Sequence, residues 1–307
     1  MLATGVFRSD RQEGSLLSTP VDTRLEAPTS SVATHPGPPP RVVLWGSALV
    51  VVTGVVLAVI GALQTGISWD EPFHVMRLRN YLDHGWFALD WSAEVAGSSE
   101  DRSNTVVYGP VAMLLLHGLT SLLGVSGWDT VATTPAAYDV RHLGVVLIGL
   151  VGTAAAAVTT RVILGSWRWA LVTAAALLAL PMWTGHLMFN IKDVPVATGY
   201  TLMTLALVAM AGAGAGRTWL RVGGLAAGIV LMVGTRPAML TAVLVGLVVL
   251  VAGAWLGPRD GTGRRLLLEA GAGVLVGAVT LLLIYPQVFA HPVLLLQSTE
   301  QSAIFRD

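Results

Sequence analysis

The chain has 307 residues, of which 54% are hydrophobic and only 12% are charged, and its formal net charge is zero. Its apolar residues come in runs close to the roughly 20 residues that cross a bilayer, which excludes an ordinary soluble domain and predicts an all-α polytopic membrane protein. No basic cluster interleaved with aromatic residues suggests a nucleic-acid partner, and the absence of cysteine excludes disulfides, thiolate catalysis and cysteine-ligated metals.

Residues 1–40 are rich in serine, threonine, proline and charge, and they end in "HPGPPP". Such a segment lacks the apolar content that offsets the entropy cost of folding, so we expect a disordered cytoplasmic tail. A cleaved signal peptide would place its apolar stretch near residue 10, whereas the first apolar run begins after Arg41. The first span is therefore predicted to be an uncleaved anchor.

Eight apolar runs follow the tail. They are Val42–Leu63, Val106–Leu123, Leu143–Leu164, Trp169–Phe189, Val194–Ala213, Val222–Gly234, Pro237–Leu256 and Leu266–Tyr285.

Positive charge in the short connections orients these runs, because Lys and Arg are enriched on the cytoplasmic side. Three connections carry such charge, namely Arg161 and Arg168; Arg217 and Arg221; and Arg259, Arg264 and Arg265. From a cytoplasmic tail, this pattern requires that one of the first three runs does not span. Val106–Leu123 is the weakest, since it is short and contains Gly109 and Pro110. The sequence thus predicts about seven transmembrane helices, with a re-entrant or juxtamembrane helix in a large first external loop over residues 65–142.

Two adjacent carboxylates, Asp70 and Glu71, open this loop within "SWDEPFH". Ser68 and Glu71 match the capping box S-x-x-E, which accounts for Glu71 as a helix cap. Asp70 has no such explanation, so a structural and a functional role both stay open for it. The residues after Pro72 mix apolar, aromatic and charged types, as expected of a helix in the plane of the membrane interface.

A second polar motif, "FNIKDVP", falls on the same external face in this topology and contains Lys192, the only lysine. Asp193 could cap the following helix, and Lys192 could extend to the interface without a binding role. A cation beside a helix N-terminus also suits a phosphate. Arg236, in the external break "TRP", is a second candidate cation, although an interfacial anchor explains it equally well.

The histidines show none of the spacings typical of metal sites. His74 is the exception of interest, because it lies one helical turn after Asp70 and could reach the same face. A divalent metal is therefore not signalled, and no cofactor is firmly implied.

Three motifs together resemble the phospholipid-carrier-dependent glycosyltransferases of the GT-C superfamily, the relatives of protein O-mannosyltransferases and lipid A aminoarabinose transferases. They are "WDEPFH" after the first span, "VYGP" later in the loop, and "MFNIKDVPVATGY" at the start of a later span. The resemblance covers about residues 41–290. Members of this family usually extend well beyond this length, so residues 291–307 are expected to be an external segment of a short form or a fragment.

The resemblance implies transfer of a sugar from a polyprenyl-phosphate donor to an acceptor hydroxyl of a protein, lipid or glycan. The reaction would take place on the non-cytoplasmic face of the cell membrane, with inversion. Carried onto this chain, Asp70 would be the general base and Glu71 would position either the acceptor or Asp70. Lys192 and Asp193 would serve the donor phosphate, and Arg236 is added to them on topology alone. The motifs supply three accessory candidates: His74, Tyr108 and Asn190.

Two other classes of function stay open: an ion-coupled secondary transporter, in which Asp70 or Asp193 would bind the coupling ion, and a non-catalytic membrane subunit. Transporters place ionisable groups near the bilayer midplane on interrupted helices. The predicted spans here are nearly free of charge, which counts against transport. A metal-dependent relative would need clustered acids and would respond to chelators.

Overall fold

The computed structural model describes residues 37–90, 107–212, 217–256, 261–291 and 293–295, and within these ranges the chain is helical and contains no strand. The predicted all-α fold is confirmed for this part of the chain. The helices are α1 (Arg41–Gln64), α2 (Glu71–His84), α4 (Val111–Leu122), α5 (Pro135–Leu164), α6 (Trp167–Leu178), α7 (Pro181–Leu187), α8 (Asp193–Gly212), α9 (Thr218–Val233), η1 (Pro237–Met239), α10 (Leu240–Leu256), α11 (Thr262–Ile284) and α12 (Pro286–Phe289). Most of the predicted tail and of the predicted external segment lie outside the described residues.

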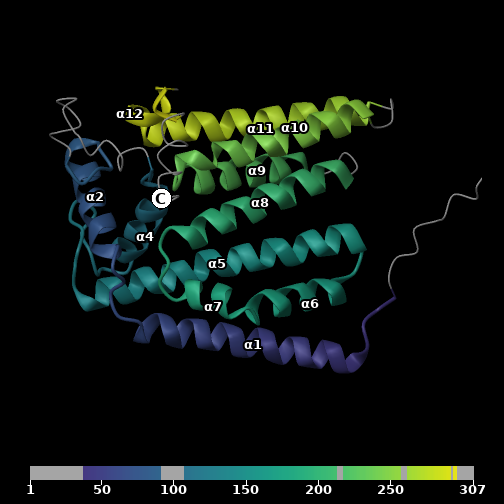
Figure 1. Cartoon of the computed structure of the whole chain (residues 1–307), viewed down its shortest axis with the longest axis horizontal. Helices are drawn as coiled ribbons and strands as arrows, with labels where there is room; N and C mark the ends of the chain where they lie inside the picture. The colour runs from purple at the N-terminus through teal and green to yellow at the C-terminus, as the bar shows by residue number, and fades with distance from the viewer. Residues whose placement is uncertain (1–36, 91–106, 213–216, 257–260, 292, 296–307) are drawn as a thin grey trace, which may run out of the picture. The chain divides into compact units, whose positions relative to one another are not determined.

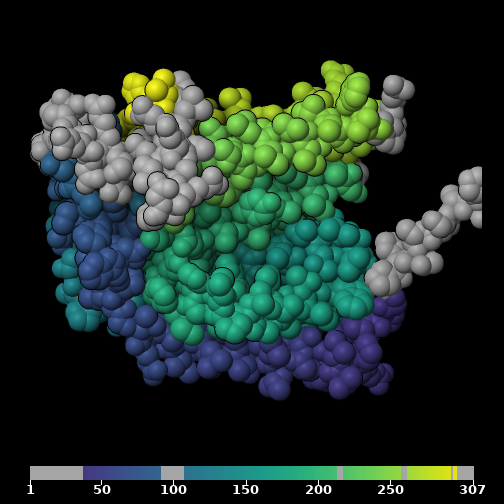
Figure 2. Space-filling model, viewed as in Figure 1, coloured from purple at the N-terminus to yellow at the C-terminus, as the bar shows by residue number. Residues whose placement is uncertain are grey.

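The long helices run alongside one another, and the short helices α2, α4 and α12 gather at one end of them (Figure 1). Figure 2 shows the long helices as successive packed layers, from α1 in purple to α11 in yellow-green. Because consecutive long helices alternate in direction, the residues just before α2, α8 and α10 all come to the end where α2 and α4 lie. We call this the loop end of the bundle.

Five helices are long and apolar enough to cross a membrane: α1, α5, α8, α10 with its preceding turn η1, and α11. Most of their residues are not buried against the rest of the protein, as expected where lipid replaces water as the solvent. A bent pair, α6 and α7, brings the number to six. This is a multi-pass membrane architecture with fewer clear spans than the predicted seven. A seventh crossing requires α9, whose 16 residues extend about 24 Å.

The predicted run Trp169–Phe189 does not form one straight helix. It divides into α6 and α7, which meet at an angle of 77°. Pro181 begins α7, and its missing N–H and its ring prevent the helix of α6 from continuing through it. The hydroxyl of Thr184 donates a hydrogen bond to the carbonyl of Leu178 (2.7 Å) and so satisfies one of the carbonyl groups that the break releases.

Helix α5 begins at Pro135, ahead of the predicted apolar run Leu143–Leu164 and within the residues predicted to form the external loop, 65–142. The Thr134 hydroxyl caps this helix by accepting a hydrogen bond from the N–H of Ala137 (3.3 Å). The sequence "TP" is an ordinary helix start that the hydropathy pattern does not detect. Helix α4, within the run predicted not to span, has 12 residues, about 18 Å, and is too short to cross the ~30 Å bilayer core.

Helices α8 and α9 pack with direct backbone contact. A Cβ atom on Gly199 would lie 2.7 Å from the carbonyl oxygen of Gly228, and a Cβ on Gly228 would lie equally close to that of Gly199. Small residues allow such close packing between helices in a membrane, where burial of apolar surface gives little drive for association. This contact fixes the start of α8 relative to the end of α9.

Exposed tryptophans mark both ends of the bundle. Those with the most exposed side chains are Trp45, Trp69, Trp128, Trp167, Trp219 and Trp255. All lie within or beside the first or last turns of helices, or in the connections between them. This placement is typical of the aromatic belts that form at the two membrane–water interfaces.

Candidate functional site

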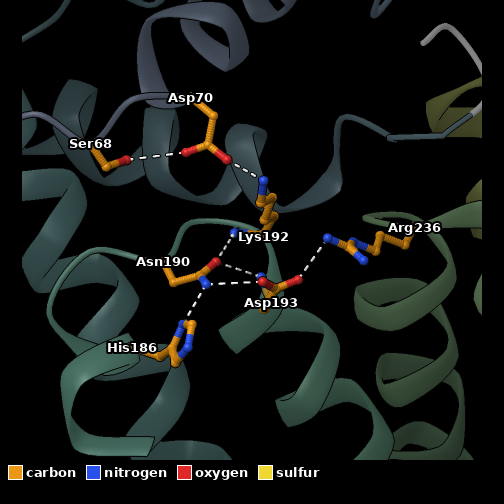
Figure 3. A network of polar contacts seen from close by, with 7 residues as sticks. All are labelled: Ser68, Asp70, His186, Asn190, Lys192, Asp193 and Arg236. Carbon is orange, nitrogen blue, oxygen red and sulfur yellow. Dashed lines mark hydrogen bonds and ion pairs between the residues drawn. The ribbon is translucent and has the colours of Figure 1, made fainter. Parts of the chain in front are cut away.

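A polar network at the loop end joins residues from the start of α2, the start of α8 and the turn before α10 (Figure 3). It contains five of the predicted site residues, namely Asp70, Asn190, Lys192, Asp193 and Arg236. The sequence separates the first and last of these by most of the membrane domain. Their meeting depends on the alternating direction of the long helices.

Asn190 builds the start of α8. Its side-chain oxygen accepts hydrogen bonds from the backbone N–H groups of Lys192 (3.3 Å) and Asp193 (2.9 Å). Asn190 therefore satisfies the N–H of the first residue of α8, a capping role that the sequence had left open for Asp193. As a result, the Asp193 carboxylate is released from capping and is available to other partners.

The Lys192 ammonium donates a hydrogen bond to the carboxylate of Asp70, and the two form an ion pair. The two motifs that the sequence places on one face therefore meet at the same end of the bundle. The pair is partly open, with 21% of the Lys192 side chain and 36% of the Asp70 side chain exposed. Burial raises the pKa of Asp70, but the hydrogen bond and charge of Lys192 outweigh it, so the pKa of this carboxyl lies below its ordinary value. Asp70 is therefore ionised at neutral pH.

Asp193 forms the second ion pair of the network, with the guanidinium of Arg236 at 2.8 Å. Its other oxygen accepts a hydrogen bond from the Asn190 amide (3.0 Å). Lys192 and Asp193 are neighbours in sequence, but their side chains point toward different partners, Asp70 on one side and Arg236 on the other (Figure 3). The network thus places two cations and two carboxylates along one short stretch of surface.

Tyr108, from the predicted motif "VYGP", lies at the centre of the cations. The guanidinium carbon atoms of Arg77 and Arg236 lie 5.1 and 5.5 Å from the centroid of its ring, and the Lys192 nitrogen lies 5.5 Å from it. All three distances are within the range of cation–π attraction. The ring therefore holds positive charges close together that would otherwise repel one another.

A backbone contact holds Tyr108 in this position. The N–H of Gly109 donates to the carbonyl of Thr235 (2.9 Å), and the N–H of Val111 donates to that of Gly234 (3.2 Å). A Cβ atom on Gly109 would lie only 2.2 Å from the carbonyl oxygen of Gly234, so this approach requires glycine. The contact joins the loop that carries Tyr108 to the turn that carries Arg236.

Glu71 points away from the network, although it follows Asp70 directly. Its side chain is 1% exposed and contacts the Nε2 atom of His142 on α5 at 2.7 Å. Successive residues of a helix point about 100° apart, which is why the two carboxylates enter different surroundings. Of the two roles expected for Glu71, positioning Asp70 agrees with this geometry, whereas contact with an acceptor does not.

His74 lies beside Tyr108, with the two ring centroids 4.8 Å apart in an edge-on arrangement. Burial lowers the pKa of His74 from its ordinary value to about 3, with further lowering by the charges of Arg77 and Lys192, against the opposing effect of Asp70. His74 is therefore neutral at physiological pH. It packs against the aromatic ring and does not add to the local positive charge.

Two adjoining apolar hollows, of about 380 and 390 Å³, open beside Asp193. Both are lined by Leu177, Trp183, Asp193 and Ala197, so they lie between the bent pair α6–α7 and the first turns of α8. Their walls are almost entirely nonpolar except for the carboxylate. A charged network and an apolar recess therefore meet at Asp193.

Arg77, His142 and His186 belong to this region but were not predicted as site residues. Arg77 follows His74 by three positions, a spacing that places both on one face of α2 and that could have indicated it. The Nδ1 atom of His186 is 2.5 Å from the Asn190 amide, within the network of Figure 3. His142 carries no recognisable sequence signal, since its partner Glu71 is 71 positions away. Within the described ranges, the structure has no cluster of three or more residues able to hold a metal ion.

Compared with known proteins, the chain matches no protein-family model, no curated protein and no solved structure. The family resemblance of its motifs therefore stays a prediction. The function of the chain has to be inferred from the geometry of the polar network.

Proposed function

We propose that this protein is a membrane glycosyltransferase that moves a sugar from a polyprenyl-phosphate donor to an acceptor hydroxyl, with Asp70 as the general base. The observation that carries the proposal is the ion pair between Asp70 and Lys192, which are 122 positions apart in the chain. A sugar transfer requires a base on the attacking hydroxyl and positive charge on the leaving phosphate. The pair holds one group of each kind at the same end of the bundle.

In the proposed reaction, the acceptor oxygen attacks the anomeric carbon of the sugar while its proton passes to the Asp70 carboxylate. The bond between the anomeric carbon and the phosphate oxygen breaks, and the polyprenyl phosphate leaves with the bonding electrons. Negative charge grows on that phosphate, so fixed cations stabilise the transition state more than the ground state. Lys192 and Arg236 would supply this charge by exchanging their carboxylate partners for phosphate oxygens, which also frees Asp70 to accept a proton.

The apolar hollows beside Asp193 support a lipid-linked donor, because the head group and the first isoprenoid units must be bound together. An apolar recess that opens beside a cationic network suits this combination of charge and hydrocarbon. The position of the Asp70 and Asp193 carboxylates at the starts of helices, and not at their middles, also favours this function over ion-coupled transport, which uses ionisable groups near the bilayer midplane.

The proposed topology has seven crossings, with the α6–α7 pair and α9 each crossing once, and a cytoplasmic N-terminus. The end opposite the loop end carries exposed arginines, namely Arg41, Arg168, Arg217 and Arg264. Positive charge favours the cytoplasmic side. The polar network would then face the outside of the cell membrane.

The decisive experiment compares membranes that contain the natural chain with membranes that contain Asp70→Asn, using labelled polyprenyl-phosphate sugars as donors. Loss of a general base is expected to lower label incorporation by about 10²–10⁴-fold. Asp83→Asn is the matched control, since Asp83 is an exposed carboxylate on the same helix α2. Equal incorporation by the natural chain and Asp70→Asn would remove the proposed base and leave the transporter or the non-catalytic subunit.

Orientation can be tested separately, because the chain contains no cysteine and any introduced thiol is unique. A cysteine at Trp128, in the loop before α5, is expected to react with an impermeant thiol reagent in intact cells. A cysteine at Trp167, at the start of α6, is expected to react only after the membrane is opened. The reverse pattern would invert the proposed topology.

A further inference from the structure

The contacts of Glu71 suggest a role for a residue that the proposed reaction does not use directly. His142 and Glu71 are almost completely buried, with 0% and 1% of their side chains exposed. Burial of ionisable groups is costly unless they are paired and hydrogen-bonded. Burial of this pair next to the proposed base therefore indicates that the pair has a structural or functional role.

The hydrogen bonds of His142 determine where its protons lie. Its Nδ1 atom lies 3.2 Å from the carbonyl oxygen of Ala62 on α1, and a carbonyl can only accept, so Nδ1 carries a hydrogen. Its Nε2 atom lies 2.7 Å from Glu71 Oε1, and one proton is shared across that contact. Whichever atom holds this proton, the pair has no net charge, which makes its burial tolerable.

The second oxygen of Glu71 connects the pair to Asp70. Glu71 Oε2 accepts a hydrogen bond from the backbone N–H of Ser68 (2.7 Å), and the Glu71 N–H donates to the Ser68 carbonyl (3.3 Å). The Ser68 hydroxyl in turn donates to the Asp70 carboxylate (3.2 Å). The turn that carries Asp70 is thus held by hydrogen bonds of Ser68, to Glu71 through its backbone and to Asp70 through its hydroxyl.

We propose that His142 and Glu71 form a positioning pair that anchors the Asp70 turn to α1 and α5 and so aims the Asp70 carboxylate at Lys192. Without the pair, the turn between α1 and α2 loses its connection to α5, which runs from the Ser68 N–H through Glu71 to His142. The Asp70 carboxylate would then no longer be held against Lys192. The kinetic consequence rests on the proposed function, whereas the structural consequence does not.

The test uses the fact that Lys192 is the only lysine, so an amine-reactive reagent reports on its ion pair at a single side chain once labelling of the N-terminal amine is separated by peptide mass. Loss of a partly exposed ion pair worth up to about 1 kcal/mol corresponds to about a fivefold rise in reactivity. Asp70→Asn should show this rise and sets the scale. Glu71→Ala and His142→Ala should raise the reactivity of Lys192 by nearly as much as Asp70→Asn does. Glu71→Gln should stay within about twofold of the natural chain, because a glutamine amide can donate to Nε2 and its oxygen can still accept from Ser68.

A buried acid at the opposite end, Glu269, provides the matched control: Glu269→Ala should leave Lys192 reactivity unchanged. Wild-type reactivity in Glu71→Ala would overturn the proposal. If Glu71→Ala does not fold, His142→Gln replaces it, since the single amide nitrogen of glutamine cannot occupy the positions of both ring nitrogens and so cannot reproduce both hydrogen bonds. Raised reactivity in His142→Gln supports the positioning pair, and unchanged reactivity overturns it.

Kinetics provide the second measurement. A misplaced base should lower kcat by up to about a hundredfold in Glu71→Ala and leave the KM for the polyprenyl-phosphate donor unchanged, with most of kcat recovered in Glu71→Gln. A rise in KM with unchanged kcat would contradict positioning of Asp70. If Asp70→Asn itself has no effect on transfer, the proposed function fails, while the reactivity of Lys192 still decides whether the pair positions Asp70.

Discussion

The two ends of the helical bundle both carry ion pairs between arginine or lysine and a carboxylate, but the pairs differ in kind. At the end opposite the loops, Arg221 on α9 contacts Glu269 on α11 through two hydrogen bonds, Nε to Oε2 (2.8 Å) and Nη2 to Oε1 (2.7 Å). Thr218 donates a further bond to the same carboxylate (3.1 Å). Both side chains are at least nine-tenths buried.

At the loop end, the pairs Asp70–Lys192 and Asp193–Arg236 are partly exposed, and Figure 3 draws a single contact between the members of each. A buried, doubly bonded pair has no capacity left for a ligand, whereas an open, singly bonded pair can exchange its partner for a phosphate. The difference indicates that one end stabilises the fold and the other is suited to binding. Substitutions at the two ends test that distinction.

The largest effect is expected from Lys192→Met. In the proposed reaction, removal of this cation from the leaving group should lower the rate of sugar transfer by about 10²–10³-fold. In addition, the burial that raises the pKa of Asp70 would no longer be opposed by Lys192. Since Asp70 must be unprotonated to act as the proposed base, the loss of activity at acid pH should move to higher pH, as measured in a pH–rate profile.

Arg264→Met removes an exposed cation from the opposite end and serves as the control for Lys192→Met. It should change neither the rate nor the pH profile. An equal loss in both variants would show that total charge, and not the position of Lys192, determines activity.

The next largest effect is expected on stability, from Arg221→Met. This change leaves the Glu269 carboxylate buried with its main partner missing, which should lower the free energy of unfolding by about 3 kcal/mol. The rate of transfer per folded molecule should not change. Thermal unfolding in detergent and the donor assay measure the two quantities.

Asp193→Asn is the reciprocal variant at the loop end. Its pair is partly exposed, so the free energy of unfolding should fall by less than about 1 kcal/mol, while transfer should fall at least tenfold. A stability loss in Asp193→Asn as large as that in Arg221→Met would remove the distinction between the two ends.

A smaller effect is expected from Gly109→Ala. The added methyl group would lie 2.2 Å from the Gly234 carbonyl oxygen, so the loop that carries Tyr108 must move away from the turn that carries Arg236. Overpacking of this kind costs about 1–3 kcal/mol, and transfer should fall about tenfold. Gly118→Ala on α4 is the control, because a Cβ there meets no atom within 4 Å. A Gly109→Ala protein with normal activity would show that the position of Tyr108 is unimportant.

The smallest effect concerns His74. Its pKa in the folded protein is about 3, below the ordinary value of 6.5, so only the unfolded chain binds the proton between these pH values. The contribution of neutral His74 to stability is therefore complete above pH 6.5 and is lost as the pH falls toward 3. In His74→Phe, the unfolding temperature should fall less steeply over this range than in the natural chain. Identical slopes would show that His74 does not titrate as its burial implies.

Much of the helical content could be predicted from hydropathy, because membrane spans are long apolar runs that bond their own backbone. The prediction is wrong where the bounds of an apolar run differ from the bounds of the helix that contains it. Pro181 divides a predicted span into α6 and α7, and α5 begins at Pro135, in residues too polar for the hydropathy pattern to include. At both places, proline and capping chemistry decides where a helix begins, whatever the apolar content of the surrounding residues.

The candidate site was predictable in part. Asp70, Lys192 and Asp193 could be identified because charged residues at the ends of apolar runs are few and stand out. His142 could not be identified, since a single buried histidine carries no signal without its partner. The sequence also left open whether Asp193 caps α8, and Asn190 takes that role.

The amino-acid sequence by itself determined that the chain is helical and apolar, and which few polar residues lie at the ends of its helices. Those features are local, since they depend on composition and on residues within a few helical turns. Only the tertiary structure decided that Asp70 meets Lys192, that Arg77, Lys192 and Arg236 surround Tyr108, and that Glu71 turns inward to His142. These contacts join segments that lie far apart in the chain, and only the packing of the long helices can bring such segments together.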